Sequence, residues 1–247
     1  MATVGATLSP SARQAVYAAK WRREHLFFTS LPIAMFVTVF AGFSQTYYLK
    51  PVFGTPALGW LYHVHGAAFT TWLLLLIAQP ALVLVRRIPL HRQLGWIAAV
   101  LVPVMAILGW LVSVDLGRRG GGPPGVPPLV FMVVPIATVV VFPAFIAAAI
   151  YWRENRDIHK RLMLIGTLEL VPAGVARLPG LLPLGPIGFF GGSDLFLLAM
   201  MGYDLVIRRR VHAATAIGGA LLMASQVGRF VLASTASWDA FAKWAIS

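Results

Sequence analysis

The chain has 247 residues, of which 59% are hydrophobic and only 11% are charged, and its mean hydropathy is +0.79. Soluble domains carry roughly 25% charged residues, so this composition excludes an ordinary soluble protein and predicts a chain that lies in a lipid bilayer. The net charge of +12 comes from short basic clusters between apolar runs, which argues against a nucleic-acid partner. Because the sequence has no cysteine, it excludes disulfides, iron–sulfur clusters and thiolate ligands.

Long apolar runs predict an all-α integral membrane bundle of seven transmembrane helices, because a helix of about 20 apolar residues crosses the hydrocarbon core. The expected helices cover 26–49, 60–85, 91–114, 128–151, 160–178, 193–207 and 212–235. The chain is then divided into an N-terminal segment at 1–25, a single transmembrane domain at 26–235 and a short tail at 236–247.

Lys and Arg residues indicate how the bundle is oriented. Most of the 20 lie in the N-terminal segment and in alternate loops; the opposite side carries only Lys50, Arg118, Arg119 and Lys243. Cytoplasmic loops have an excess of these residues. The pattern therefore predicts a cytoplasmic N-terminal segment and an external tail.

The second predicted helix begins with two histidines in the stretch HVHG. His63 and His65 point about 200° apart on a helix, so they are not expected to share one interior site. His63 lies on the same, more polar stripe as Thr70, which favours an inward-facing His63. Neutral imidazole binds zinc, copper and iron. Histidine beside Trp60 is, alternatively, typical of the membrane interface.

Further histidines are predicted on the cytoplasmic side, namely His25, His91, His159 and His212. His91 and His159 are distinctive because each precedes a basic residue and an apolar helix, in IPLHRQLGW and RDIHKRLML. Together with Arg92 they predict a haem or divalent-metal site. The structural alternative is that they are hydrated residues at helix starts, as Pro89 in the first helical turn indicates.

The fifth predicted helix contains Glu169, the only acid expected near the bilayer midplane. Pro172 follows three residues later and removes a backbone donor, so the helix should kink or open there. Ionisable residues inside a membrane are costly and usually face a bundle interior or a wet cavity. Glu169 is therefore predicted to bind a ligand or a proton. The alternative is a protonated carboxyl group hydrogen-bonded to a neighbouring helix.

Two cations, Arg177 and Arg229, are predicted near the outer ends of the fifth and seventh helices. With Tyr48 they would border a polar cavity that opens to the outside and attracts an anionic small molecule or haem propionates. The other polar residues expected there are Tyr47, His63, His65 and Asp194. The structural alternative is that both arginine stems extend to the lipid headgroups.

The sequence resembles a group of bacterial multi-pass membrane proteins of unknown function. The resemblance is carried by GFSQTYYL, HVHG, LHRQLGW and IHKRLML, and it extends from Gly42 to Arg177. It implies a location in the bacterial cytoplasmic (inner) membrane.

His65, and His91 followed by Arg92, also resemble the pattern of membrane b-type haem proteins, including the ascorbate-linked di-haem cytochromes. This second resemblance implies haem b as a cofactor. Those cytochromes place paired histidines at matched depths on facing helices. Here His65 and His91 are expected at opposite ends of their helices, whereas His91 and His159 are expected at similar depth.

Three hypotheses of function follow. The favoured one is a redox or electron-transfer protein in which haem or a divalent metal is bound by histidines at helix ends, namely His63, His65, His91 and His159. The second is a proton-coupled transporter or binding protein that uses Glu169 and the two arginines to bind an anionic small molecule. The third is an accessory subunit of a larger membrane complex. The sequence lacks H-E-x-x-H and G-x-S-x-G motifs, which disfavours a hydrolase.

Overall fold

The protein is described by a computed structural model that covers residues 9–247, so residues 1–8 of the predicted N-terminal segment lie outside it. Every regular element in the covered part is a helix. Six helical segments are long and apolar enough to cross a membrane, as expected for a multi-pass membrane protein. They are α1 (Pro10–Phe43) with the π-helix η1 (Ser44–Tyr48), α3 (Trp60–Leu84), α4 (Ile88–Arg118), α5 (Pro128–Phe131) with α6 (Val133–Tyr151), η2 (Leu182–Leu184) with α9 (Gly185–Arg208), and α10 (Ala213–Ala233).

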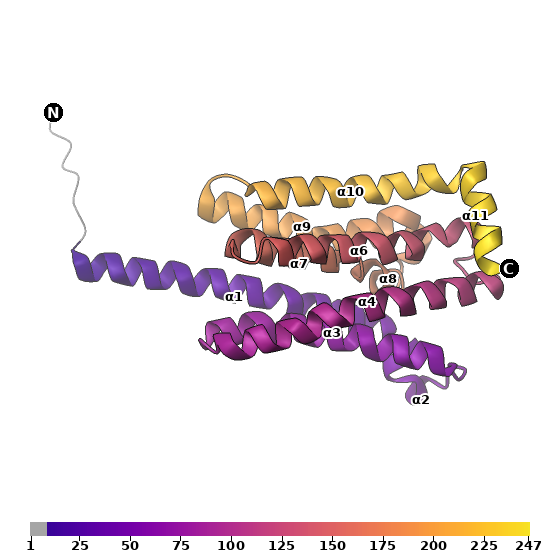
Figure 1. The fold of residues 1–247 in the computed structure, drawn as a ribbon, viewed down its shortest axis with the longest axis horizontal. Coiled ribbons are helices and arrows are strands. Elements are labelled where there is room, and N and C mark those ends of the chain that lie inside the picture. Colours follow the sequence, from indigo (N-terminus) through magenta and orange to yellow (C-terminus); the bar gives the residue numbers. More distant parts are fainter. Residues whose placement is uncertain (1–8) are drawn as a thin grey trace.

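These segments run along one common direction in an elongated bundle (Figure 1). One end carries the α3–α4, α6–α7 and α9–α10 connections and is called the basic end. Its Lys and Arg residues include Arg86, Arg87, Arg92, Arg153, Arg156, Lys160, Arg208, Arg209 and Arg210. The other end, called the α11 end, carries η1, the short helix α2 (Lys50–Phe53) and α11 (Ala236–Ile246).

The segment predicted as one helix at 160–178 consists of two shorter helices, α7 (Arg156–Leu168) and α8 (Val171–Val175). It is therefore not among the six long apolar segments. Pro172 lies in the first turn of α8, where its missing N–H group leaves no helical hydrogen bond unmade. The N–H groups of Glu169 and Leu170 donate to carbonyls three residues back, as in a turn. The expected opening of the helix beside Glu169 is present.

Helices α1 and α8 approach so closely that both positions at their contact require glycine. A Cβ on Gly174 would lie 2.8 Å from the Cα of Val39, and a Cβ on Gly42 would collide with the carbonyl group of Gly174. Small residues allow such backbone contact between helices in a membrane. The contact holds the segment that follows Glu169 against α1.

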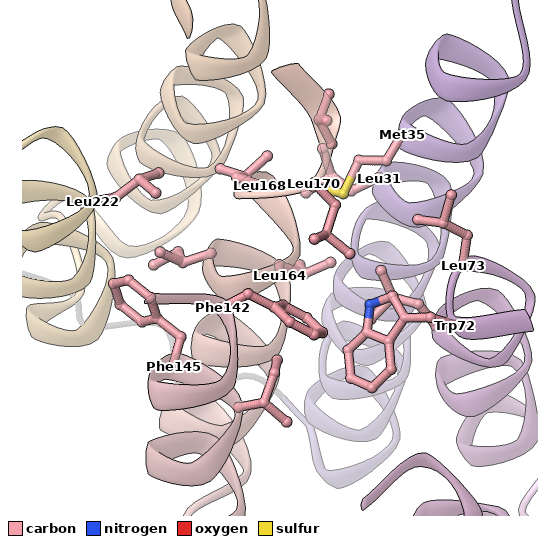
Figure 2. Close-up of a cluster of buried hydrophobic side chains, with 14 of the residues drawn as sticks. Leu31, Met35, Trp72, Leu73, Phe142, Phe145, Leu164, Leu168, Leu170 and Leu222 are labelled. Atoms are coloured by element: carbon pink, nitrogen blue, oxygen red, sulfur yellow. The ribbon is translucent and has the colours of Figure 1, made fainter. Parts of the chain in front are cut away.

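The main hydrophobic core includes residues of α1, α3, α4 and α6 to α10, and Figure 2 shows Trp72 facing Phe142 within it. The Trp72 side chain is fully buried. Its indole N–H donates to Oγ1 of Thr167 at 3.2 Å, and its ring meets that of Phe142 edge-on with centroids 5.0 Å apart. This contact joins α3 to both α6 and α7.

Residues 236–247, predicted as a tail, contain the helix α11, which packs across the α11 end of the bundle (Figure 1). Its buried Trp238 donates its indole N–H to the carbonyl of Leu129 at 2.8 Å. The Nε of Arg118 donates to the carbonyl of Ile246 at 2.8 Å. Helix α11 is thereby attached to both α4 and α5.

Candidate functional site

A cavity of about 610 Å³ lies in the half of the bundle nearest the α11 end. Its volume is in the range of small-molecule sites, roughly 300–1,000 Å³. It extends along α4 from Met105 to Leu116, a length of about 16 Å at 1.5 Å per residue. The apolar part of its wall includes the buried residues Val39, Leu73, Met105 and Phe142. Residues from the connecting loops border it on the other side, namely Leu58, Pro123, Pro124 and Leu182.

Two of the charged residues that line the cavity form a buried ion pair. The guanidinium of Arg229 on α10 contacts the carboxylate of Glu169, and the two side chains are only 2% and 1% exposed. The Thr138 hydroxyl donates to Glu169 Oε2 at 3.2 Å, and the Ser225 hydroxyl donates to Oε1 at 3.2 Å. Arg229 also donates to Thr138 Oγ1 at 3.3 Å. The two opposite charges therefore compensate each other within the protein, as buried charges require, while Nε of Arg229 has no hydrogen-bond partner in the described part of the chain.

The third charged residue in the cavity wall is Arg177, which follows α8. Its Nη1 donates to the carbonyl of Ala173 at 2.5 Å, and its guanidinium lies 4.1 Å from the ring centroid of Phe43. Within residues 9–247 Arg177 takes part in no ion pair. The wall therefore has one cation whose charge is not balanced by a carboxylate.

Tyrosines from η1 form another part of the wall. The Tyr48 hydroxyl forms a 2.8 Å hydrogen bond with Thr70 Oγ1. The Tyr47 ring lies against Gly66, where an added Cβ would be 2.3 Å from Cζ of the ring, and the Tyr47 hydroxyl donates to the carbonyl of His63 at 3.1 Å. π-Helical turns are frequent at functional sites, and here η1 places both tyrosines against α3.

The expectation that His63 faces inward is wrong. His63 is exposed and does not line the cavity, whereas His65 is partly buried and does. The His65 ring stacks on Phe69 with centroids 4.1 Å apart, and its Nδ1 is buried without a hydrogen-bond partner in the described part of the chain. The inward stripe of α3 includes Tyr62, His65, Gly66, Phe69, Thr70 and Leu73. Thr70, which shares the more polar stripe with His63, does line the cavity, but His63 lies two turns nearer the start of the helix and does not.

Asp194 also lies away from the cavity. Its carboxylate accepts a hydrogen bond from Nε2 of Gln226 at 3.0 Å. Of the residues predicted to border a polar cavity, the structure brings together Tyr47, Tyr48, His65, Arg177 and Arg229, and it adds Glu169.

His91 and His159 lie at the basic end, in the first turns of α4 and α7, and do not reach this cavity. Both are partly buried. The Nδ1 of His91 lies 3.3 Å from the carbonyl of Gln79, and the Nδ1 of His159 lies 2.8 Å from that of Ala149. Arg92, predicted to accompany them, is exposed.

The other two histidines have local structural roles. His212 is the N-cap of α10, and its Nδ1 accepts from the N–H of Ala214 at 3.0 Å. The Nδ1 of His25 lies 2.9 Å from the carbonyl of Trp21, one turn earlier. Across residues 9–247, no three His, Asp or Glu side chains come together as a group that could hold a metal ion.

A second buried ion pair, which the sequence analysis missed, lies at the basic end. The guanidinium of Arg161 on α7 contacts Asp204 on α9, and each side chain is 1% exposed. Asp204 also accepts from Thr215 Oγ1 at 2.8 Å and from the N–H of His212 at 3.1 Å. The pair joins α7, α9 and α10. Asp204 lies within the apolar run MMGYDLVI, and an acid in such a run indicates a buried polar contact. It was overlooked because the basic cluster that begins at Arg208 is only four residues away.

Asp157 extends this network at the first turn of α7. Its carboxylate contacts Lys160 at 2.7 Å and Arg208 at 3.2 Å. Burial opposes ionisation of Asp157, but the hydrogen bonds from Lys160 and Arg208 outweigh it and hold the pKa of this carboxyl group well below its usual value. Asp157 is thus ionised at neutral pH and links Lys160 and Arg208 at the basic end.

In residues 9–247, the fold and the cavity together define an all-helical protein with six apolar, membrane-length segments and a cavity of small-molecule size. Comparisons with protein-family models, curated proteins and solved structures find no match for the chain. The resemblances in sequence motifs therefore stay predictions, and function is inferred from the cavity and its charges.

Proposed function

We propose that this protein binds one amphipathic small molecule, with an apolar body and an anionic group, in the cavity at the α11 end. The observation that carries the proposal is the combination of a largely apolar and aromatic wall with the unbalanced charge of Arg177. Ligand sites typically have an apolar lining and a few polar groups that orient the ligand. Arginine is well suited to a carboxylate or phosphate because its guanidinium can donate two parallel hydrogen bonds.

This function is favoured over the redox hypothesis because the histidines do not converge on the cavity. Only His65 lines it, His63 is exposed, and His91 and His159 lie at the other end of the bundle. The binding hypothesis also has a transport form, in which the ligand is moved across the membrane together with a proton that binds to Glu169. It requires Glu169 to separate from Arg229, its partner in the ion pair.

We further infer that the basic end faces the cytoplasm of a bacterial inner membrane. The Lys and Arg residues at this end support that orientation through the positive-inside bias. With α7 and α8 as a broken seventh crossing, the N-terminal segment would be cytoplasmic and α11 external. The cavity would then lie in the outer half of the membrane.

The binding function is tested with tritiated dodecanoate and protein purified in a neutral maltoside detergent. Ala106 lines the cavity and is partly buried, so Ala106→Phe fills part of the space and should weaken binding at least about tenfold, as loss of 1.4 kcal/mol or more would do. Ile107, the next residue, is 61% exposed on the outer surface of α4. Ile107→Phe is the matched control and should bind as the unsubstituted protein does. Equal binding by the two variants would place the site elsewhere.

A haem or metal site at His91 and His159 is the second candidate function, supported by their Nδ1 contacts. Metal-bound histidines commonly donate the other ring N–H to a backbone carbonyl, and both residues have a carbonyl in that position. Arg92 beside them would suit a haem propionate.

An absorption spectrum of the purified protein, oxidised and then reduced with dithionite, tests this second candidate. Haem bound by the pair should give a Soret band that shifts on reduction and is lost in His159→Ala. His25→Ala is the control, because His25 also contacts a carbonyl but belongs to α1. Protein from cells with ample haem that shows no visible absorption contradicts the haem form, and measured metal content then decides for or against zinc.

A further inference from the structure

The charged side chains that line the cavity do not cancel one another. Three charged side chains line it, namely Glu169, Arg177 and Arg229. Glu169 and Arg229 compensate each other in their ion pair, while Arg177 has no carboxylate partner in residues 9–247. The sum over these three side chains is one positive charge.

Arg177 is exposed where it borders the cavity, whereas Arg229 is buried. Even so, a charge at membrane depth is screened less than one in bulk water, because the surrounding dielectric constant is low. A ligand with one negative charge brings the sum for the cavity to zero. A neutral ligand leaves the charge of Arg177 unbalanced, and a dianion leaves an excess negative charge. Charge balance therefore distinguishes ligands that have the same apolar body.

We propose that the cavity selects a monoanionic amphiphile whose charged group is bound by Arg177, while the Glu169–Arg229 ion pair stays intact. This inference rests on the proposed function and names the charge class of the ligand. It also makes Arg177, and not the more deeply buried Arg229, the residue that determines specificity.

Hydrogen bonding supports this choice between the two arginines. Arg229 is 2% exposed, and its terminal nitrogens already donate to protein oxygens on Glu169, Thr138 and Ser225. Arg177 donates to one protein acceptor, the carbonyl of Ala173, so it keeps donors for a ligand.

The test uses three probes with the same alkyl chain and different charge: dodecan-1-ol, dodecanoate and dodecyl phosphate. At pH 8 the phosphate is largely dianionic, because its second pKa is about 6. Apparent affinities are obtained from the rise in unfolding temperature over a concentration series of each probe in maltoside detergent. The ratio of affinities for two probes is then compared between variants, so that partition of each probe into micelles cancels.

Arg177→Gln removes the unbalanced charge and should lower the dodecanoate-to-dodecanol affinity ratio by about 10- to 100-fold, as loss of charge-assisted hydrogen bonds would. Arg177→Lys should keep most of the preference for dodecanoate. The double variant Glu169→Gln, Arg229→Gln leaves the sum of charges unchanged and should keep the ratio within about threefold. Asp204→Asn breaks the other buried ion pair, outside the cavity, and should also leave the ratio unchanged.

Each outcome bears on the proposal. A ratio that falls in Arg177→Gln and is kept in the double variant supports it. A ratio that is kept in Arg177→Gln and falls in the double variant would make Arg229 the anion-binding residue and overturn it. Saturable binding with the same ratio in every variant overturns the inference but leaves the proposed function standing. If none of the three probes stabilises the unsubstituted protein, both are overturned.

Discussion

Arg229→Met should lower the free energy of unfolding by about 3–5 kcal/mol, the cost of removing one partner from a buried ion pair. Methionine is similar in length to the aliphatic part of arginine, so the loss of packing is small. The carboxylate of Glu169, which is 1% exposed, would have no cation to compensate it. Unfolding in mixed maltoside and dodecyl sulfate micelles, followed by circular dichroism, measures the effect.

The double variant Glu169→Leu, Arg229→Met should recover most of that stability, because apolar residues often replace a buried ion pair at little cost. The neighbouring hydroxyls would still be satisfied: Thr138 can donate to the carbonyl of Val134 at 3.1 Å, and Ser225 to that of Leu222 at 2.8 Å. Lys243→Met in the exposed pair with Asp239 is the control and should cost less than about 1 kcal/mol. A double variant as unstable as Arg229→Met would contradict this account of the pair.

Trp72→Ala should lower the free energy of unfolding by about 3 kcal/mol, the lower end of the range for removing a buried tryptophan. The lower end is expected because lipid, not water, surrounds the helices when they separate. The substitution removes both the edge-on contact with Phe142 and the hydrogen bond to Thr167. The same unfolding assay measures it.

Two further substitutions separate the contribution of the hydrogen bond to Thr167 from that of the aromatic packing, and test whether any tryptophan would have the same effect. Trp72→Phe keeps an aromatic ring but loses the hydrogen bond to Thr167, and it should cost about 1 kcal/mol. Trp96 is 76% exposed on α4, so Trp96→Ala should have little effect. A loss in Trp96→Ala equal to that in Trp72→Ala would show that the core contact is not what stabilises the bundle.

Most of the apolar helices could be predicted from the sequence, because length and hydropathy depend on local composition. Their number could not, because six and not seven segments are long and apolar enough to cross a membrane. The beginnings of α3 at Trp60 and of α5 at Pro128 coincide with the predicted boundaries. The opening of the fifth segment beside Pro172 was also predictable, since the missing N–H acts within one helical turn. Glu169, Arg177 and Arg229 could be singled out because ionisable residues are rare among apolar ones.

Tertiary structure alone decided which of these residues meet. Glu169 and Arg229 are 60 residues apart in sequence, and their pairing depends on how α10 is rotated against the break after α7. The choice of His65 over His63 had the same origin. The few polar residues of α3 lie on different faces, so its sequence does not mark the side that faces the bundle. Composition and hydropathy along the chain thus determined that the protein forms membrane-length helices. Rotation and contact of those helices determined the cavity and left Arg177 as its unbalanced charge, because side-chain direction is set by packing between helices.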